Sequence, residues 1–458
     1  MAACALASAR VRDGAVISSR RHQTQTAELL AIPAETFYAA AEEALPSDRL
    51  QMQPCDFDFL RACGLLAIAS IQEGRIDAMQ KYIGYYFTMM AVQQGHDEAN
   101  WPPGLSRVEM EERRRLYWSI YTLDIYSSIV WDGCFHFQEA HARVEYPSGD
   151  VYSPNPHSLQ DQSDPPWIIG WNFTTDLYRI LEHFVGKLRT RGSTFNFLED
   201  AQTNPSFHSE GIIRRVTERY AMLPNQFKDL REATEDPNVD IYGFQSANIH
   251  ATMALLRMVL YTLEGQNRDI YKKCTVAHEV LSTFREVPLS FWRAISTPLI
   301  YHIASIGALL WSAMEGPLSD TSYQRVRTLL LEMAELLQSM EQFLNRGAGE
   351  GQRLREMVAR IDEFFAKQLA THNGHHVVPS AGVLPVDNSD AQSQAGSQVG
   401  SGGAPVGGGN GQGGVDELSP QFQLPYELLQ EWTWPSDISQ AYLPGIYNYH
   451  PAYTGPYG

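Results

Sequence analysis

Apolar runs of helical length dominate the sequence between about Asp56 and Phe365, and they limit the possible folds more than any other feature. These runs alternate with Gly, Pro and Asn residues that end helices, whereas the period-two patterns typical of strands are hard to find. The sequence therefore predicts an all-α fold built as one large multi-helix domain.

Three helices are defined most clearly at the start of this region. Residues Phe57–Gln72 are apolar almost all round, which indicates a central helix, and Gly74 ends it. A second helix over Ile76–Gln93 follows after a short turn, so the two are expected to pack antiparallel. Ser106 has the spacing of a capping box, which predicts a third helix over Met110–Trp131.

The rest of the region carries further helical patterns. We predict helices over Thr175–Leu188, Ser209–Met222, Tyr242–Glu264, Tyr271–Phe284, Phe291–Met314, Ser322–Leu344 and Gln352–Ala370. The last is strongly amphipathic and is assigned, within residues 346–376, as the C-terminal helix of the domain. Residues Tyr146–Pro166 are rich in Pro, Ser and Asp and are predicted to form a long surface loop.

Charge and cysteine content exclude several classes of protein. Lys and Arg number 35 against 53 Asp and Glu, so the formal net charge is -18 and the chain should repel phosphate backbones. Five cysteines without C-x-x-C spacing argue against a disulfide framework and predict a reducing compartment. The longest uncharged stretch, Ser296–Met314, falls short of a membrane span and is predicted to be a buried helix, with no membrane partner.

Residues 1–50 are predicted to be a poorly defined N-terminal region. Their arginines, with only Asp13 as an acid before Glu28, loosely resemble a mitochondrial transit peptide. A disordered start, or a first exon that is wrong, is the favoured interpretation.

Composition changes sharply after His376. Residues 377–415 consist largely of Gly, Ser, Ala, Gln and Pro, which predicts a disordered linker because so little apolar surface is available for burial. Residues 416–458 hold five acids, no Lys or Arg, and nine aromatic residues. This composition is typical of acidic activation segments that fold on a partner's groove, with anchors predicted at Phe422, Leu424, Leu428, Leu429, Trp432 and Trp434. A tail that docks on the chain's own helical domain is an equally weighted alternative.

Catalytic motifs are missing, so no catalytic residue is assigned and the chain is predicted not to be an enzyme. There is no adjacent Asp-Asp pair, Walker P-loop, H-E-x-x-H or G-x-S-x-G. His372, His375 and His376 cluster without a carboxylate or thiolate and are assigned to a solvated turn, and His136 and His141 to surface or turn positions. No metal site is predicted.

One run in the third predicted helix resembles a known signature. It reads Glu112-Arg113-Arg114-Arg115-Leu116-Tyr117-Trp118-Ser119-Ile120-Tyr121-Thr122-Leu123-Asp124 and continues to Ser127 or Ser128 and Gly133. The run resembles the middle homology domain of fungal binuclear zinc cluster transcription factors, approximately E-x-R-R-R-x-x-W-x-x-Y-x-L-D, then S and G-x-P. Flanking blocks at Gly64–Ala67, Gly74–Arg75, Gly95–His96 and Val144–Pro147 agree in order and spacing. Phe135 replaces the proline of G-x-P.

The resemblance implies a helical regulatory domain over residues 51–345 whose signature positions hold the fold. These positions are Arg114, Arg115, Trp118, Asp124 and Gly133. Trp118 is expected to fill a large core volume, and Glu111 is expected to pair with Arg115 at the exposed start of the helix. The buried carboxylate of Asp124 is expected to pair with an arginine of the same or a neighbouring helix.

The zinc cluster of this family is absent from the sequence. Such a cluster needs six cysteines within about 35 residues, and residues 1–55 contain only Cys4 and Cys55. No cofactor is therefore expected in this chain, since zinc would require a further N-terminal cluster, and DNA binding by the chain itself is not expected.

Together these observations predict a nuclear fungal regulator of RNA polymerase II transcription. Expected partners are the transcription machinery or a co-activator, bound through the tail, and related factors in a homo- or heterodimer. Two alternatives stay open: a partner-dependent co-regulator without DNA contact, and a helical sensor that encloses a small molecule in an apolar cavity.

Overall fold

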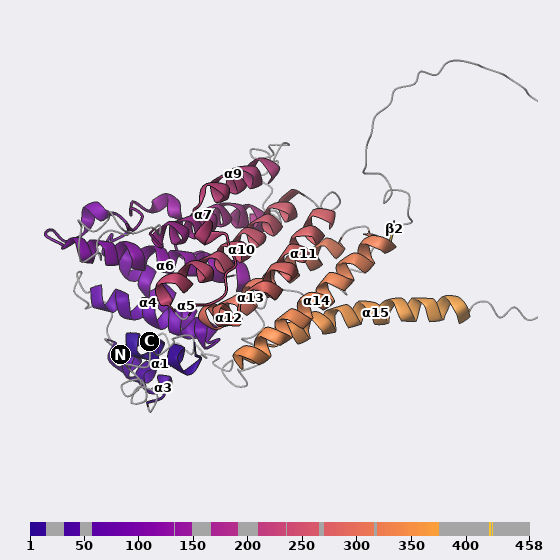
Figure 1. Cartoon of the computed structure of the whole chain (residues 1–458), viewed down its shortest axis with the longest axis horizontal. Coiled ribbons are helices and arrows are strands. Elements are labelled where there is room, and N and C mark those ends of the chain that lie inside the picture. The colour runs from indigo at the N-terminus through magenta and orange to yellow at the C-terminus, as the bar shows by residue number, and fades with distance from the viewer. Residues whose placement is uncertain are drawn as a thin grey trace, which may run out of the picture.

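Helices make up most of the chain that the computed structural model describes, and they confirm the predicted all-α fold (Figure 1). The described residues are 1–14, 32–45, 57–131, 133–148, 166–190, 209–234, 236–264, 270–315, 318–374, 421–422 and 424.

The helices follow one another as α1 (Ala2–Arg12), α3 (Ala34–Glu43), α4 (Phe57–Gln72), α5 (Ile76–Val92), α6 (Arg107–Trp131), α7 (Ile168–Thr190), α9 (Ser209–Met222), α10 (Pro237–Glu264), α11 (Ile270–Glu286), α12 (Leu289–Ile295), α13 (Thr297–Trp311), α14 (Asp320–Leu344) and α15 (Glu350–Gly374). Short 3-10 turns cover Glu98–Asn100, Glu139–His141, Asn225–Phe227 and Ser312–Glu315. Two short strands, β1 (Leu318–Ser319) and β2 (Gln421–Phe422), pair antiparallel.

Helix α13 lies at the centre of the helical array. It contacts α4, α6, α10, α11, α14 and α15, and all of its residues except Pro298 are buried. The window Thr297–Met314 is long and apolar enough to cross a membrane, but 89% of it is buried inside the protein. The predicted buried helix is therefore confirmed, because neighbouring helices cover every side of this segment.

The prediction of one continuous helix over Phe291–Met314 was wrong. Helix α12 ends at Ile295, and Ser296 adopts φ 63° and ψ -145°, which no helix tolerates. Pro298 lies in the first turn of α13, where its missing N–H has no intrahelical acceptor to lose. The proline therefore allows α13 to begin at Thr297 and prevents α12 from continuing through it.

Most other boundaries agree within four residues, but α7 and α10 both begin earlier than predicted, α10 at Pro237 instead of Tyr242. Helices α4 and α9 have the predicted limits, whereas α7 begins at Ile168 instead of Thr175. The first turns of α7 are apolar and bury Ile168 and Phe173, so packing extends the helix toward its N-terminus. The loop predicted over Tyr146–Pro166 falls mostly outside the described residues.

Helices α1 and α3 pack on α4. These two helices lie within residues 1–50, which we expected to be poorly defined. Ala2, Ala5 and Ala9 of α1 are buried, and α1 contacts both α3 and α4. In α3, Tyr38 is buried and its hydroxyl lies 2.7 Å from the Ser70 hydroxyl of α4. Alanines give a weak apolar signal, but their small size lets helix backbones approach closely, so this packing is hard to see in the sequence.

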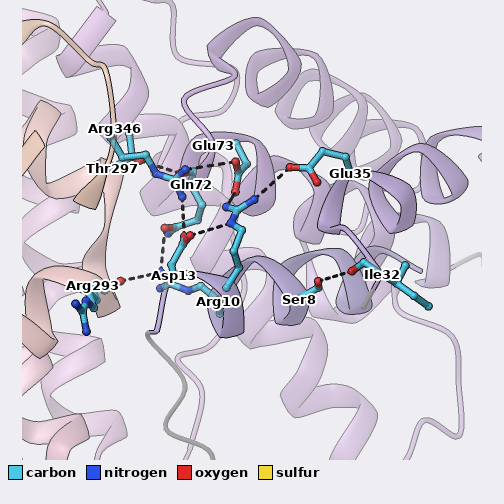
Figure 2. Close-up of polar contacts among 11 residues, drawn as sticks. Ser8, Arg10, Asp13, Ile32, Glu35, Gln72, Glu73, Arg293, Thr297 and Arg346 are labelled. Atoms are coloured by element: carbon cyan, nitrogen blue, oxygen red, sulfur yellow. Dashed lines mark hydrogen bonds and ion pairs between the residues drawn. The ribbon is translucent and has the colours of Figure 1, made fainter. Parts of the chain in front are cut away.

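A cluster of charges, here called the N-terminal lock, holds the end of α1 against distant parts of the chain (Figure 2). It consists of Arg12, Asp13, Glu73 and Arg346. Arg12 lies 3.0 Å from Asp13 and 2.5 Å from Glu73, while Arg346 lies 2.6 Å from Asp13 and 3.6 Å from Glu73. The side chains of Asp13, Glu73 and Arg346 are only 15–17% exposed. The lock therefore ties the end of α1 to Arg346, which lies two residues after α14.

Arg10 completes this junction by binding the C-terminal end of α12. Its guanidinium donates to the carbonyl of Arg293 at 3.2 Å, to that of Ala294, and to the Gln72 side chain at 3.1 Å (Figure 2). The last carbonyls of a helix have no partner within it, so a cation at this position stabilises the helix end. Thr297 adds a 2.8 Å hydrogen bond to the Gln72 carbonyl.

We expect the Asp13–Arg346 pair of the lock to contribute measurably to stability. A double-mutant cycle with Asp13→Ala and Arg346→Ala should give a coupling energy of about 1–2 kcal/mol, because both partners are largely shielded from water. Urea denaturation followed by circular dichroism measures it.

The exposed pair Arg285–Glu332 is the matched control for this cycle. It spans a comparable 2.9 Å but is 56% and 36% exposed, so its coupling should be much smaller. Equal coupling energies in the two cycles would contradict a structural role for the lock.

A buried carboxylate lies at the start of α15. The Glu350 side chain is 1% exposed, and its nearest cation is Arg353 at 3.5 Å. Burial raises the pKa of Glu350 to about 7, partly opposed by Arg353 and reinforced by Glu341. A carboxyl whose pKa is raised in the folded state favours folding at low pH, and that contribution is lost as the pH rises from its ordinary pKa through 7.

Replacing this carboxylate should reveal the cost of burying its charge. Glu350→Gln should be more stable than the natural chain by about 2 kcal/mol at pH 8 and nearly equal to it at pH 4. Thermal unfolding measured across this pH range tests the expectation. A stability difference that does not change between pH 4 and pH 8 would show that the Glu350 carboxyl does not titrate in this window.

Candidate functional site

The signature residues lie on α6, the helix that the capping-box pattern predicted. The Ser106 hydroxyl accepts the backbone N–H of Glu109 at 3.1 Å, which is the hydrogen bond that such a cap requires. Further along α6, Tyr117, Ile120 and Tyr121 are fully buried. The cap and the buried face together fix the direction in which the signature side chains point.

Arg114 binds two carboxylates from segments on either side of α6. It makes a two-pronged contact with Glu98 at 2.8 and 2.7 Å and a third contact with Glu145 at 2.7 Å. Glu98 also accepts the backbone N–H of Glu145 at 2.8 Å. The hydrogen bonds with Glu98 raise the pKa of Arg114 above its ordinary value, so the guanidinium stays charged and is paired with the two carboxylates.

Arg115 forms the predicted pair with Glu111, but the pair is not exposed. The two side chains are 3.1 Å apart, and Glu111 is only 1% exposed. Glu111 also accepts the Ser148 backbone N–H at 3.0 Å, and Arg115 donates to the Ser148 carbonyl at 3.3 Å. The expected exposed position is wrong because residues up to Ser148 return over α6 and cover Glu111.

Trp118 fills core volume as predicted and also binds the returning segment. It is 4% exposed, and its indole N–H donates to the Glu145 carbonyl at 3.0 Å. Its ring lies 4.9 Å from the ring of Tyr146. Trp118 thus joins the core of the domain to the segment that follows the signature.

Asp124 pairs with a histidine and not with the arginine that we expected. This carboxylate is fully buried, and it accepts both the His136 backbone N–H at 2.9 Å and a 2.7 Å contact with His136 Nδ1. The hydrogen bond with Asp124 raises the pKa of His136 above its ordinary value, although burial opposes the shift. His136 also stacks on Phe87 of α5. The chain turns back after α6, and this turn places His136 beside the Asp124 carboxylate.

Gly133 lies in the turn that Asp124 holds, but its geometry does not require glycine. Its φ angle is not positive, and an added Cβ would meet Gln80 Nε2 at 3.5 Å, an ordinary contact distance. The replacement of the family proline by Phe135 therefore falls in a turn whose shape depends on Asp124.

These contacts form one unit, here called the signature clamp: Arg114, Arg115, Trp118 and Asp124, together with the segment 136–148 that they bind. Arg179 of α7 extends the clamp by binding Glu139 and, at 3.0 Å, the Tyr146 hydroxyl. Each signature charge is neutralised by a partner within the domain. The clamp is therefore suited to holding a rigid shape.

The tail contributes a second set of predicted residues, of which the structure describes few. The backbone of Phe422 lies in strand β2, which pairs with β1, and Leu424 is 3% exposed. Leu428, Leu429, Trp432 and Trp434 lie outside the described residues. The described part of the tail thus contacts the chain's own helical domain.

Comparison with known families agrees with the geometry of the signature clamp. Residues 3–204 match the family described as the fungal specific transcription factor domain. Over this part of the chain, which is less than half of it, the protein is therefore similar to that domain. The match includes α1 and α3 as well as the whole signature clamp. No curated protein and no solved structure matches the chain.

The described residues do not fit the zinc cluster found in relatives with this domain. Cys4, Cys63 and Cys274 lie on α1, α4 and α11, and Cys134 lies in the turn after α6. No group of three or more potential ligands occurs in the described part of the chain. His375 and His376 lie outside the described residues, as does the side chain of His372. No step of the proposed function therefore depends on a metal bound by these residues.

Two hollows lie in the described part of this domain, and the first borders segment 136–148 of the signature clamp. One has a volume of about 420 Å³ and is lined by Gln94, His96, Asp97, Asn100, Ala140, His141 and Arg143. The other has a volume of about 430 Å³ and is lined by Phe57, Asp58, Arg61, Ser106, Val108, Glu109 and Glu112. Both linings are mainly polar, unlike the apolar cavity that the sensor alternative requires.

Gly64 permits close packing of α4 on α6, and we did not predict this contact from the sequence. An added Cβ at this position would lie 2.6 Å from Leu116 Cδ1 and 3.3 Å from Ile120 Cδ1, so α4 and α6 can approach closely only because residue 64 is glycine. A glycine inside an otherwise apolar helix is the signal that could have identified this contact.

Replacing Asp124 should loosen the turn of the transcription factor domain. Asp124→Asn should lower the pKa of His136 and destabilise the domain by about 2–4 kcal/mol, because the buried carboxylate holds the turn through two contacts. The loss should be larger at pH 6 than at pH 9, since a raised histidine pKa stabilises the folded state at low pH and that stabilisation is lost as the pH rises through it.

Histidine titration by NMR, together with thermal unfolding, measures both effects. His183 on α7 is the internal control, because burial lowers its pKa independently of Asp124. An unchanged His136 titration in Asp124→Asn would contradict the pairing.

Proposed function

We propose that the chain regulates transcription in the fungal nucleus, with the helical domain as a rigid platform and the tail as the recruiting element. The match of residues 3–204 to the fungal transcription factor domain carries this proposal. The family that residues 3–204 match consists of transcription factors, and this supports a non-enzymatic function.

The internal charge pairing supports the platform role of the helical domain. Arg114, Arg115 and Asp124 all bind groups within the same domain, so their charges hold helices and the returning segment in place. A net charge of -18 gives the chain little attraction for DNA. In this proposal, any contact of a zinc cluster with DNA comes from outside these 458 residues, for example from a related factor that dimerises through the helical domain.

Composition supports a recruiting role for residues 416–458. Five acidic residues and no basic ones surround leucines and aromatics, a pattern that can steer toward and then fill a partner's groove. The proposed partner is a component of the transcription machinery or a co-activator. The mainly polar hollows beside the signature clamp lend less support to the sensor alternative.

Fusion of residues 416–458 to a heterologous DNA-binding domain tests the recruiting role. The fusion should activate a reporter gene, and replacing Leu428, Leu429, Trp432 and Trp434 by alanine should reduce its output roughly tenfold or more, because these residues are the proposed anchors.

A variant with Tyr447, Tyr449, Tyr453 and Tyr457 replaced by alanine is the matched control, since it removes four aromatic residues beyond the acidic block. It should keep most of the output. No reporter activity from the unmodified fusion, at a protein level equal to that of an active reference, would refute a recruiting tail.

A further inference from the structure

A carboxylate without hydrogen bonds lies where the start of α15 packs on α14 and α13, a contact here called the α15 seam. Glu350 is the first residue of α15, and its side chain is 1% exposed. Neither of its carboxylate oxygens has a hydrogen-bond partner in the described part of the chain, and the Arg353 guanidinium lies 3.5 Å away. Because a charge buried without hydrogen bonds is costly, the seam closes more readily around the protonated carboxyl.

The three helices approach one another closely in this seam. An added Cβ at Gly351 would lie 2.8 Å from the Ala334 carbonyl oxygen of α14, and one at Gly307 of α13 would lie 3.3 Å from Leu354 Cδ1. Leu354 is as deeply buried as Glu350. The closed seam therefore shields the carboxylate from solvent.

The groups that face Glu350 do not compensate for a negative charge. Glu341 of α14 lies beside it and accepts the Glu350 backbone N–H at 2.8 Å. Burial raises the pKa of Glu350 to about 7, partly opposed by Arg353 and reinforced by Glu341. Burial also raises the pKa of Tyr301 on α13 and the pKa of Tyr126 on α6, and the Glu350 charge adds to both shifts. Near neutral pH, Glu350 and not a tyrosine therefore changes charge.

The position of α15 allows the seam to open locally. Figure 1 shows α15 along the edge of the helical array, where it contacts α13 and α14. The turn that precedes it contains Asn345 and Gly349, whose φ angles are 50° and 75°. A helix at an edge can separate from its neighbours at a smaller cost in free energy than unfolding of the whole domain.

We propose that Glu350 is a proton-dependent latch, in which the protonated carboxyl holds the start of α15 in the seam and loss of the proton to solvent promotes its release. In the open seam the carboxylate is hydrated, so a rise in pH makes opening more frequent. The turn that opens contains Arg346 of the N-terminal lock, whose backbone N–H donates to the Glu341 carbonyl at 2.9 Å. The proposal is independent of the recruiting function of the tail.

Hydrogen exchange measured by mass spectrometry tests the latch in the full chain. The natural chain is compared with Glu350→Gln at pH 6 and at pH 8, so that the intrinsic pH dependence of exchange cancels. With a pKa near 7 in the closed seam and an ordinary pKa in the open one, opening of the natural chain relative to the variant should rise roughly tenfold between these pH values in peptides covering residues 350–361. Helix α7, which packs on α6 and α10, should exchange equally in both chains over the same times.

Two further variants separate the latch from a general effect of charge. Glu356→Gln makes the same chemical change at an exposed position of α15 and should keep the natural pH dependence. Arg353→Met removes the cation that lowers the pKa of Glu350, so opening should level off at a higher pH than in the natural chain, without any change to Glu350 itself. Equal exchange of the natural chain and Glu350→Gln at both pH values, or the same change in α7 as in α15, would overturn the latch.

Discussion

Burial of α13 is the constraint on which the rest of the structure depends. This helix has apolar residues on every side, so its burial requires other helices to surround it. Its start is set by Ser296 and Pro298, which separate it from α12 and turn the chain toward the end of α4. Arg10 binds carbonyl groups at this junction, since helix ends leave carbonyl groups that need partners, and the ion pairs of the N-terminal lock lie beside it. Hydrophobic burial thus positions the helices, and charged side chains satisfy the ends that this burial creates.

The signature clamp applies the same logic to the fungal transcription factor domain. A run of arginines, an aromatic residue and an aspartate looks in isolation like a binding or catalytic motif. In the folded chain each of these groups binds a segment that follows α6, and the buried Asp124 holds the turn at His136. A signature of this kind identifies a family because it specifies a shape.

The sequence predicted the helices better than it predicted the contacts between them. Periodicity predicted α4 and α9 with the observed limits, since the spacing of apolar residues reports directly on helix formation. It did not reveal α1, whose buried face consists largely of alanines, or the break at Ser296 within an otherwise apolar run. The clamp positions were identified through the family resemblance, but their partners were only partly foreseen. Glu111 was found with Arg115 because both lie on one helix, whereas the partner of Asp124 lies in a turn whose path no local pattern encodes.

The sequence by itself determined that this protein is helical, that it carries the fungal transcription factor signature, and that an acidic aromatic segment follows a glycine-rich stretch. Each of these properties is local, since it depends on residues within a few turns of one another. Tertiary structure alone decided that Arg346 meets Asp13, that Glu350 is buried, and that Gln421 lies opposite Ser319. Such contacts join residues far apart in the chain, and they exist only because packing around α13 brings those residues to the same place.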